Sequence, residues 1–481
     1  MNYQKIINSL GIILMIIGIS MVFPLLWSLY YGDSDCRAFF LSSCITLFVG
    51  FVSYKDTEAE GNIQNKEAFC IVVMGWLLAS CFGTLPYLLS GTFSSFADAF
   101  FETMSGFTTT GASVLSNIEG LPHGVLFWRS FTHWLGGMGI IVLFVALLSS
   151  LGTGGAQMFR AESPGPVSEK IKPRISETAK ILWYTYLMLT ILETILLCLF
   201  GMPLFDALCH TFGTLATGGF STKNASVGYY SSPGIEWVII IFMFLSGANF
   251  ALHYHAFRAK SLKGYWRNSE FKVYSCIILI VIVLITFNIN TDGYKSLGES
   301  IRGAAFQVVS IITTTGYVTV DFDRWSSLSK AILITLMFIG GCAGSTGGSI
   351  KVGRILVLLK QTKLELQRSL HPRAILNMKI DRKNINNGVV VNILQFFFIY
   401  IAIGLAGTIF MASLGLDLVT AFTSVAATLG NVGPGMGLVG PTQNYAFIPD
   451  VGKYVLSFFM LLGRLELYTV LVLFLPSFWR K

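Results

Sequence analysis

The sequence predicts an all-α polytopic membrane protein in which four similar units surround one pore axis with pseudo-fourfold symmetry, preceded by two further transmembrane helices. The first observation behind this prediction is composition: of the 481 residues, 53% are hydrophobic and only 12% are charged. This is too apolar for a soluble chain of that length, so the chain is expected to lie in a bilayer. The second observation is a segment that recurs four times, each time between two apolar runs of the roughly 20 residues that cross a bilayer.

The recurring segment is an apolar run that ends in small residues and a glycine. Each copy has an alanine twelve positions before that glycine, and the four copies are Ala99–Gly111, Ala207–Gly219, Ala304–Gly316 and Ala421–Gly433. Similarity that returns at a fixed offset indicates a repeat architecture. Each unit therefore has the form M1–P-loop–M2: a span, a re-entrant half-helix with its returning strand, and a second span.

The order of these elements along the chain defines the domain organisation. Two spans, at 6–30 and 37–54, make up an N-terminal part (1–67) that lacks the recurring segment. The four repeats are predicted at 68–180, 181–271, 272–388 and 389–481. Their paired spans are expected at 68–90 and 124–150, at 181–201 and 235–257, at 272–289 and 328–358, and at 389–414 and 453–476.

The strand after each half-helix is the candidate cation-binding element. A cation that leaves water needs replacement oxygens, and a strand supplies them when consecutive carbonyls turn to one side. Glycine reaches the required backbone angles at little cost. The copy at Ala304–Tyr317 resembles the pore helix and selectivity filter of a potassium channel. The predicted potassium-binding residues are Thr109, Thr110, Gly111, Thr217, Gly218, Gly219, Thr314, Thr315, Gly316, Asn431, Val432 and Gly433.

The basic residues indicate the orientation in the membrane. The formal net charge is +8, and most of the 33 Lys and Arg residues fall in polar segments on the side of the N-terminus. Because Lys and Arg accumulate in the cytoplasm, the N-terminus and the C-terminus are both predicted to be cytoplasmic. Attraction to anionic membrane lipids explains the basic linkers 152–180, 258–271 and 359–388, and no nucleic-acid partner is expected.

Two features below the predicted filter are candidates for a gate. The run Gly340–Gly348, GGCAGSTGG, interrupts what would otherwise be one helix, and such a break inside the membrane is expected to face an aqueous cavity. Its alternative is a close-packing glycine patch. Arg464 lies near the centre of the span 453–476, where a charged side chain costs at least ~2.5–3.5 kcal/mol. It is expected to face the pore or to pair with Glu466 or Glu193.

The chain resembles the Trk/Ktr/HKT superfamily of cation transporters, and specifically its TrkH type, along essentially its full length. The motifs that carry the resemblance are TTTGA (108–112), ATGGF (216–220), TTTGY (313–317), NVGPG (431–435), WRSFTHWLGGMGI (128–140), GGCAGSTGG (340–348) and GRLE (463–466). The resemblance implies potassium uptake across the cytoplasmic (inner) membrane, a homodimer, and regulation by a cytosolic nucleotide-binding ring subunit of the TrkA type. The nucleotide would act on that partner, and no covalent cofactor is implied.

The resemblance also implies roles for single residues. Gly111 stands where some sodium-preferring members carry serine, which implies potassium. Asn431 and Val432 replace the threonines of other repeats, so the filter is expected to be less symmetric than that of a tetrameric channel. The implied gate consists of Arg464 and the loop residues Gly340, Gly341, Ala343, Gly344, Ser345, Thr346, Gly347 and Gly348.

The main alternative function is a proton- or sodium-coupled secondary cation transporter, since broken helices occur there too. Inverted repeats are typical of that class, whereas these four units run in the same order. An enzyme is not predicted, because no cluster of acids, histidines or nucleophiles gathers near one interface. The basic linkers could also dock the regulatory ring, and neutralising Lys170, Lys172 and Arg174 would separate docking from lipid contact.

Other polar residues in apolar runs are given no transport role. Arg129 is expected to snorkel toward the interface or to form a local ion pair. His210, His253 and His255 lack converging acids or cysteines, so no metal site is predicted.

Overall fold

The computed structural model describes the chain except for residues 56–62, 140–174, 292–295, 375, 382 and 481. The described part is mostly helical, as predicted. Its paired strands form one short hairpin in the linker before the last repeat, β1 (Lys379–Ile380) and β2 (Lys383–Asn384).

The helices follow the predicted order of spans and half-helices. The N-terminal part and predicted repeat 1 contain α1 (Tyr3–Ser20), α2 (Val22–Tyr31), α3 (Cys36–Lys55), α4 (Asn65–Gly83), α5 (Leu85–Leu89), α6 (Phe96–Phe107) and α7 (His123–Gly137). Predicted repeat 2 contains α10 (Ile175–Leu199), α11 (Leu204–Ala216), η2 (Ser226–Tyr230), α12 (Pro233–Ser246), α13 (Phe250–Ala259) and α14 (Lys263–Arg267). Predicted repeat 3 contains α15 (Ser269–Thr291), α16 (Leu297–Ile312), η3 (Phe322–Arg324), α17 (Ser327–Met337) and α18 (Val352–Leu370). Predicted repeat 4 contains α19 (Asn387–Ser413), α20 (Leu418–Leu429), η4 (Gly437–Val439), α21 (Asp450–Arg464), α22 (Tyr468–Leu471), η5 (Val472–Phe474) and α23 (Pro476–Trp479).

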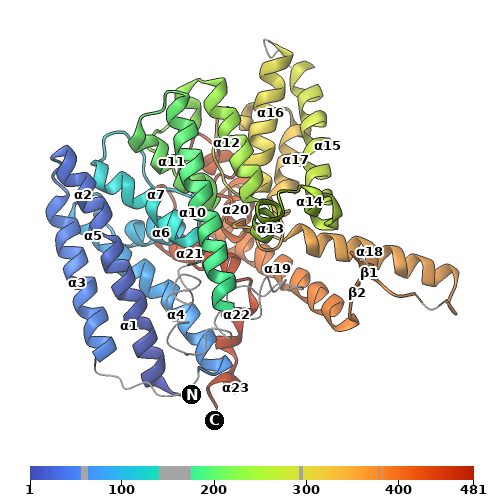
Figure 1. Cartoon of the computed structure of the whole chain (residues 1–481), viewed down its shortest axis with the longest axis horizontal. Helices are drawn as coiled ribbons and strands as arrows, with labels where there is room; N and C mark the ends of the chain where they lie inside the picture. Colours follow the sequence, from blue (N-terminus) through green and yellow to red (C-terminus); the bar gives the residue numbers. More distant parts are fainter. Residues whose placement is uncertain (56–62, 140–174, 292–295, 375, 382, 481) are drawn as a thin grey trace.

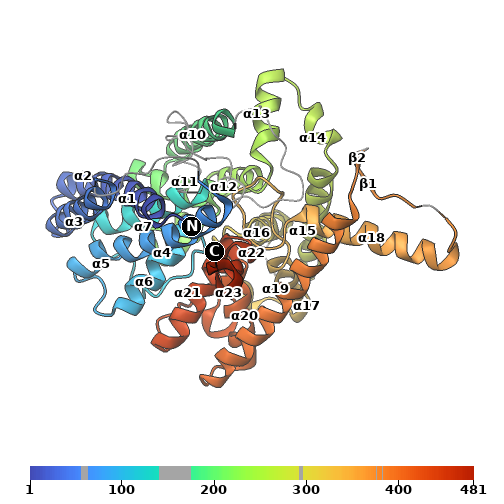
Figure 2. The ribbon, with the colours of Figure 1, turned by 90° about the horizontal axis from the view of Figure 1, so that it is seen from below.

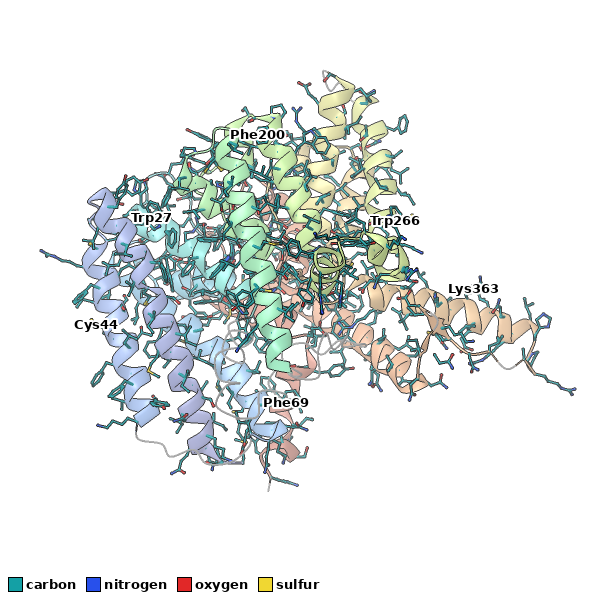
Figure 3. All side chains as sticks on the ribbon, viewed as in Figure 1. Trp27, Cys44, Phe69, Phe200, Trp266 and Lys363 are labelled. Carbon is teal, nitrogen blue, oxygen red and sulfur yellow. The ribbon has the colours of Figure 1, made fainter. Side chains whose placement is uncertain are left out.

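The long helices have the dimensions of membrane spans. Six of those described are long and apolar enough to cross a bilayer, or up to eight if each of two bent helix pairs is one span. The N- and C-termini lie at the same end of the molecule (Figure 1). The outer faces of the spans carry exposed apolar side chains, among them Phe48, Phe287 and Phe398, and Figure 3 shows Cys44 on the outer side of α3. An exterior of this kind suits hydrocarbon rather than water.

The helices α1, α2 and α3 form a group at one side of the molecule (Figure 1 and Figure 2). The close approach of α1 to α3 depends on small residues: a Cβ atom on Gly11 would lie 2.7 Å from the Gly50 carbonyl oxygen, and a Cβ on Gly50 would lie 2.8 Å from that of Gly11. Small residues let backbones approach in this way in membrane helix pairs, where van der Waals contact replaces the hydrophobic effect.

Four short helices, α6, α11, α16 and α20, correspond to the predicted half-helices. The side chains of Ser95, Ser296 and Asp417 cap α6, α16 and α20, each accepting a backbone N–H of the first turn, and Pro203 precedes α11. These are favoured helix-start residues. All four helices are largely buried and pack against the surrounding spans.

One predicted span, 235–257, is not a continuous helix, which corrects the sequence prediction. It breaks after Ser246 into α12 and α13, which are bent by 100°. Asn249 starts the new helix, because its Oδ1 accepts the Ala251 N–H (2.8 Å). The sequence carried a signal for this break, since Gly247 and Asn249 are typical of helix ends and helix starts.

The span predicted at 453–476 also breaks, after Arg464, with 113° between the two parts. Arg464 therefore lies at the end of α21 rather than at the centre of a span. Glu466 and Leu467 both have φ +57°, a backbone region that is uncommon for residues other than glycine. Glu466 forms an ion pair with Arg354 of α18, so a tertiary contact accompanies the bend.

The break predicted within 328–358 is present, since α17 ends at Met337 and α18 begins at Val352. The span predicted at 124–150 is described only through Gly139. Its remainder and the linker residues Lys170, Lys172 and Arg174 lie outside the described residues.

Candidate functional site

The four predicted glycines meet at one place in the structure. Each lies so close to a carbonyl oxygen of the following strand that a Cβ atom added to it would collide with that oxygen. The pairs, with the glycine first, are Gly111 with Gly218, Gly219 with Thr315, Gly316 with Val432, and Gly433 with Thr110. The carbonyl in each pair belongs to the residue just before the next glycine, and the fourth pair returns to the first strand. The four strands thus form a closed ring, which we call the filter ring.

The filter ring has the same backbone conformation in all four strands. The glycines have φ between +79° and +99°, a region that glycine enters without a steric penalty. The residue two positions earlier is also left-handed in every strand, with φ between +53° and +60°, and these residues are Thr109, Thr217, Thr314 and Asn431. The residue between them has negative φ. Alternating handedness allows consecutive carbonyls to turn toward one side, as an ion-coordinating strand requires.

The left-handed threonines and asparagine follow from how each half-helix ends. Their N–H groups donate to the carbonyl three residues earlier (3.0–3.2 Å), and the next N–H donates to the carbonyl five residues earlier (2.8–2.9 Å). This pair of bonds is the Schellman motif, usually completed by glycine. Sequence reasoning placed these four residues in the predicted filter but explained only the glycines, and it missed that these residues would be left-handed. The available signal was a Thr or Asn always two positions before the glycine.

The expected loss of symmetry in repeat 4 appears in the side chains and not in the backbone. The Asn431 amide nitrogen donates to Thr110 Oγ1 (2.9 Å) and to the Met460 carbonyl (2.9 Å). Asn431 therefore links the fourth strand to the first. Val432 is fully buried, and its carbonyl takes the same place in the filter ring as that of Thr315.

The loop between α17 and α18 lies directly against the filter ring. The Gly348 N–H donates to Thr314 Oγ1 (2.7 Å), and a Cβ on Gly347 would lie 3.0 Å from the Thr313 carbonyl oxygen. The Thr346 hydroxyl donates to the Leu215 carbonyl (2.9 Å) at the end of α11. A Cβ on Gly348 would also collide with the Gly430 carbonyl oxygen. The loop thus contacts the residues that lead into three of the four strands.

Arg464 connects this loop to the filter ring. Its Nη1 donates to Thr109 Oγ1 (3.0 Å) and to the Thr346 carbonyl (2.7 Å), and its Nη2 donates to the carbonyls of Gly136 (2.5 Å) and Gly137 (2.9 Å). Among its predicted acidic partners, Glu466 instead forms an ion pair with Arg354. A positive charge therefore lies beside the first residue of a filter strand.

The remaining residues of the loop are held by backbone contacts. Glu270 Oε1 accepts the N–H groups of Ala343 (2.7 Å) and Gly353 (2.8 Å). Further contacts include Gly340 N–H to the Ile350 carbonyl (2.9 Å), Val352 N–H to the Gly341 carbonyl (3.1 Å), Cys342 N–H to the Gly247 carbonyl (2.8 Å), Phe250 N–H to the Gly344 carbonyl (3.0 Å), Ser345 hydroxyl to the Cys342 carbonyl (2.6 Å), and Lys351 Nζ to the Gly347 carbonyl.

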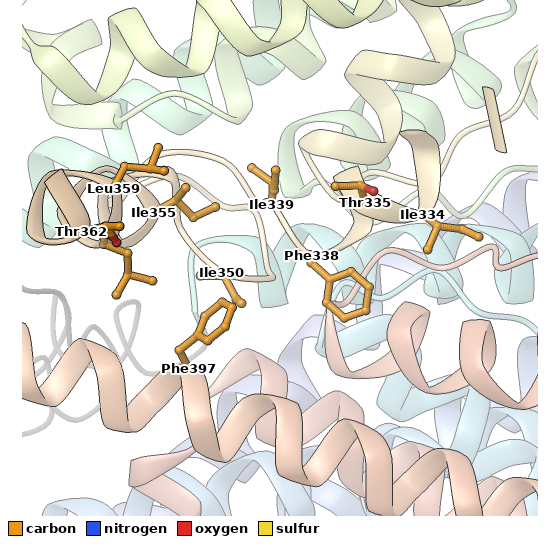
Figure 4. Close-up of a pocket in the computed structure, with 10 residues that line it drawn as sticks. Ile334, Thr335, Phe338, Ile339, Ile350, Ile355, Leu359, Thr362 and Phe397 are labelled. Atoms are coloured by element: carbon orange, nitrogen blue, oxygen red, sulfur yellow. Dashed lines mark hydrogen bonds between the residues drawn. The ribbon is translucent and has the colours of Figure 1, made fainter. Parts of the chain in front are cut away.

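The residues at the two ends of the loop, Ile339 and Ile350, line an apolar cavity of about 400 Å³. Ile339 and Ile350, which pair as a parallel bridge, face it together with Phe338 and Phe397 (Figure 4). The ends of the loop are thus joined to each other and rest on apolar side chains.

The structure decides between the two alternatives for Arg129, snorkelling toward the interface and a local ion pair. It is 1% exposed and pairs with Glu102 (Nε to Oε1, 2.8 Å). The local ion pair is confirmed, and snorkelling toward the interface is wrong. Glu102 in turn accepts the Val114 N–H (2.9 Å) just beyond the first filter strand.

These observations define a class of protein: a polytopic helical membrane protein in which four half-helices and their returning strands close around one axis. The chain belongs to the TrkH family, described as cation transport proteins, which it matches over residues 36–481.

Relatives of known name match the chain over its whole length. It is 42% identical to the Trk system potassium uptake protein TrkH of Salmonella typhimurium (strain LT2) over 485 residues, and 41% identical to that of Escherichia coli (strain K12) over 489, with 100% of each chain covered. The crystal structure of the potassium transporter TrkH from Vibrio parahaemolyticus matches with a TM-score of 0.90 at 38% identity, again over 100% of both chains. The predicted TrkH-type resemblance and fold class are confirmed. These relatives are transporters and not enzymes.

Proposed function

We propose that the chain takes up potassium across the cytoplasmic membrane through the filter ring. The observation that carries the proposal is the closure of four glycine-containing strands, each with its carbonyl next to the following glycine. Such a ring can replace the hydration shell of a monovalent cation by backbone oxygens. The four half-helices end at the ring, and their C-terminal ends add about half a negative charge each. The relatives are named potassium uptake proteins, and we take the identity of the ion from them.

In this proposal the loop at 340–348 and Arg464 form the gate. A cation leaving the filter ring would approach the guanidinium that holds Thr109 and Thr346 together. Like charges a few ångströms apart in a poorly screened site repel by several kcal/mol. Opening would require the loop to leave Thr314 and Arg464 to turn away from the filter ring.

The proposal also includes the partners and the orientation. The relatives belong to a named Trk system, which supports assembly with other Trk components. The resemblance to the TrkH type adds the proposal that these are a regulatory ring of the TrkA type that carries the nucleotide, and that the chain forms a homodimer. The helix α18 projects from the body with Lys363 on it (Figure 3) and exposes Arg368 as well. We place this helix and both termini in the cytoplasm, where the basic linkers would meet the ring subunit or anionic lipid.

Purified protein in liposomes tests the proposed function. Single-channel currents and reversal potentials are measured under opposed potassium and sodium gradients, with and without a pH gradient. Potassium-selective current that reverses at the potassium equilibrium potential would support conduction through the filter ring. A reversal potential that moves with the pH or sodium gradient at fixed potassium would favour the coupled transporter, and absence of potassium flux would overturn the proposal.

A further inference from the structure

The fourth residue of the recurring segment is polar in every repeat and buried in the structure. These residues are Glu102, His210, Gln307 and Ser424, each three positions after the shared alanine. A buried polar side chain is costly unless it is hydrogen-bonded. The position therefore raises the question of what each of these side chains contacts.

Three of the four contact the chain just after their own filter strand. Glu102 Oε1 accepts the Ser113 hydroxyl (2.9 Å), His210 Nε2 lies 2.9 Å from Ser221 Oγ, and Gln307 Nε2 donates to Thr319 Oγ1 (3.3 Å). Repeat 4 differs: Ser424 bonds to Ala421 of its own helix, and the neighbouring Thr423 accepts the Met436 N–H (3.0 Å). Each half-helix is thus joined, behind the filter ring, to the segment that leaves it.

Repeat 1 is the one in which this contact is ionic and reaches a second repeat. Beyond its bond to Glu102, Arg129 donates through Nη2 to Ser113 Oγ (3.3 Å) and through Nη1 to the Ser221 carbonyl (3.1 Å). Its guanidinium also lies 4.3 Å from the ring centroid of Phe220, the residue after Gly219. One buried side chain thereby holds the segments that leave the first and second filter strands.

We propose that Arg129 and Glu102 are positioning residues that determine cation selectivity by fixing the spacing between the first and second filter strands. The inference rests on the proposed function and adds to it a specificity-determining pair outside the ring of carbonyls. The reach of the guanidinium sets how closely the segments after Gly111 and Gly219 approach each other. Since the carbonyl of Gly218 lies directly against Gly111, a change in that spacing changes the oxygen cage available to the ion.

A role in stability alone accounts poorly for this arrangement. A buried ion pair contributes little net stability compared with apolar side chains of similar volume, because both charges lose water. The planar guanidinium of the arginine, in contrast, fixes the distance and direction of several hydrogen-bond acceptors at once. Fixed distances of this kind are needed at a site whose geometry discriminates between ions.

The test measures the potassium-to-sodium permeability ratio from reversal potentials in liposomes, for the wild-type protein, Glu102→Gln, Arg129→Gln and Ser113→Ala. Glu236→Gln serves as the matched control, since Glu236 pairs with Arg302 between two helices (2.7 Å) without contacting a filter strand. We expect both pair variants to lower the ratio by roughly tenfold, which corresponds to about 1.4 kcal/mol of lost discrimination. Ser113→Ala should lower it less, and Glu236→Gln should leave it unchanged.

The outcomes separate this inference from the proposed function. A wild-type protein without potassium selectivity would contradict the proposed function itself. A selective wild type, with folded pair variants that melt at a lower temperature yet keep the ratio, would overturn the positioning role. If the pair variants do not fold, the Ser113→Ala variant tests the positioning role, because it removes one hydroxyl and no charge. An unchanged potassium-to-sodium permeability ratio in that variant would also overturn the positioning role.

Discussion

The filter ring and the loop below it are in contact, yet they are held in place by different means. The filter ring is fixed by backbone geometry repeated four times: paired left-handed residues, the same terminal hydrogen bonds and glycines packed against carbonyls. The loop occurs in one repeat. Backbone hydrogen bonds hold it to the start of α13, but its hydrogen bonds at the filter ring and at its outer side are made by single side chains, chiefly Arg464, Thr314 and Glu270. Bonds made by single side chains can be released one at a time, whereas the bonds of the filter ring recur in four strands that pack on one another. The filter ring is therefore suited to keep the oxygen cage constant, and the loop is suited to move.

The largest effect is expected from a substitution in the filter ring. Gly219→Ala would force a left-handed conformation on alanine and place its Cβ against the Thr315 carbonyl. Because a displacement of about 1 Å in a positioned site can cost roughly 100-fold, selective potassium flux in liposomes should fall by about that factor. Gly201→Ala is the matched control, since Gly201 has φ +93° and open space around it. If both variants lost flux equally, the backbone strain and not the carbonyl contact would be responsible.

The next effect concerns the loop. Arg464→Ala removes a charge and the bonds to Thr109 and Thr346, so basal cation flux should rise by at least about tenfold, the equivalent of ~1.4 kcal/mol. Arg464→Lys keeps the charge without the planar fork and should raise it less. Selectivity should change less than flux in both. A well-folded Arg464→Ala protein with unchanged or lower flux would contradict the proposed gate.

A smaller increase in basal flux is expected from substituting Glu270, which holds the loop on the side away from the filter ring. Glu270→Gln retains an oxygen for the N–H groups of Ala343 and Gly353 but loses the charge that strengthens those bonds. Basal flux should rise about threefold, measured as potassium efflux from loaded liposomes. Glu299→Gln, in the exposed first turn of α16, is the control and should have no effect. A fall in flux would show that Glu270 favours the open arrangement instead.

The smallest effect is expected at the start of a half-helix, away from both regions. Asp417 caps α20 by accepting the Thr420 N–H (3.1 Å), and the hydrogen bonds from Thr420 hold the pKa of its carboxyl below the ordinary value of 3.8. Asp417→Ala should lower the free energy of unfolding by about 1 kcal/mol, with selectivity and basal flux unchanged.

The pH dependence follows from that lowered pKa. The stability that Asp417 contributes is present above the ordinary pKa and is lost as pH falls through the lowered value of the folded state. The difference in melting temperature between wild type and variant should therefore shrink in acid. A difference that grows in acid would contradict this assignment.

Much of the site could be predicted because repetition makes a weak signal specific. One glycine after a threonine says little, but four at the same distance from an alanine fixed the register of Gly111, Gly219, Gly316 and Gly433, and the structure brings all four together. The break at Gly340–Gly348 was equally visible, since a run of glycines disfavours helix. The bend after Arg464 was not, because the single Gly463 beside it lies within α21 and residues 465–467 include no glycine or proline.

The membrane class, the fourfold repeat and the residues of the filter ring can be read from the amino-acid order, because hydrophobicity and glycine placement are local properties. Three other features emerge from the packing of the helices: Arg464 ends a helix and contacts Thr109, Glu466 pairs with Arg354, and Arg129 joins the first two repeats. Those contacts join residues distant in sequence, and a charged side chain in a membrane protein has many possible partners until the packing of the helices selects among them.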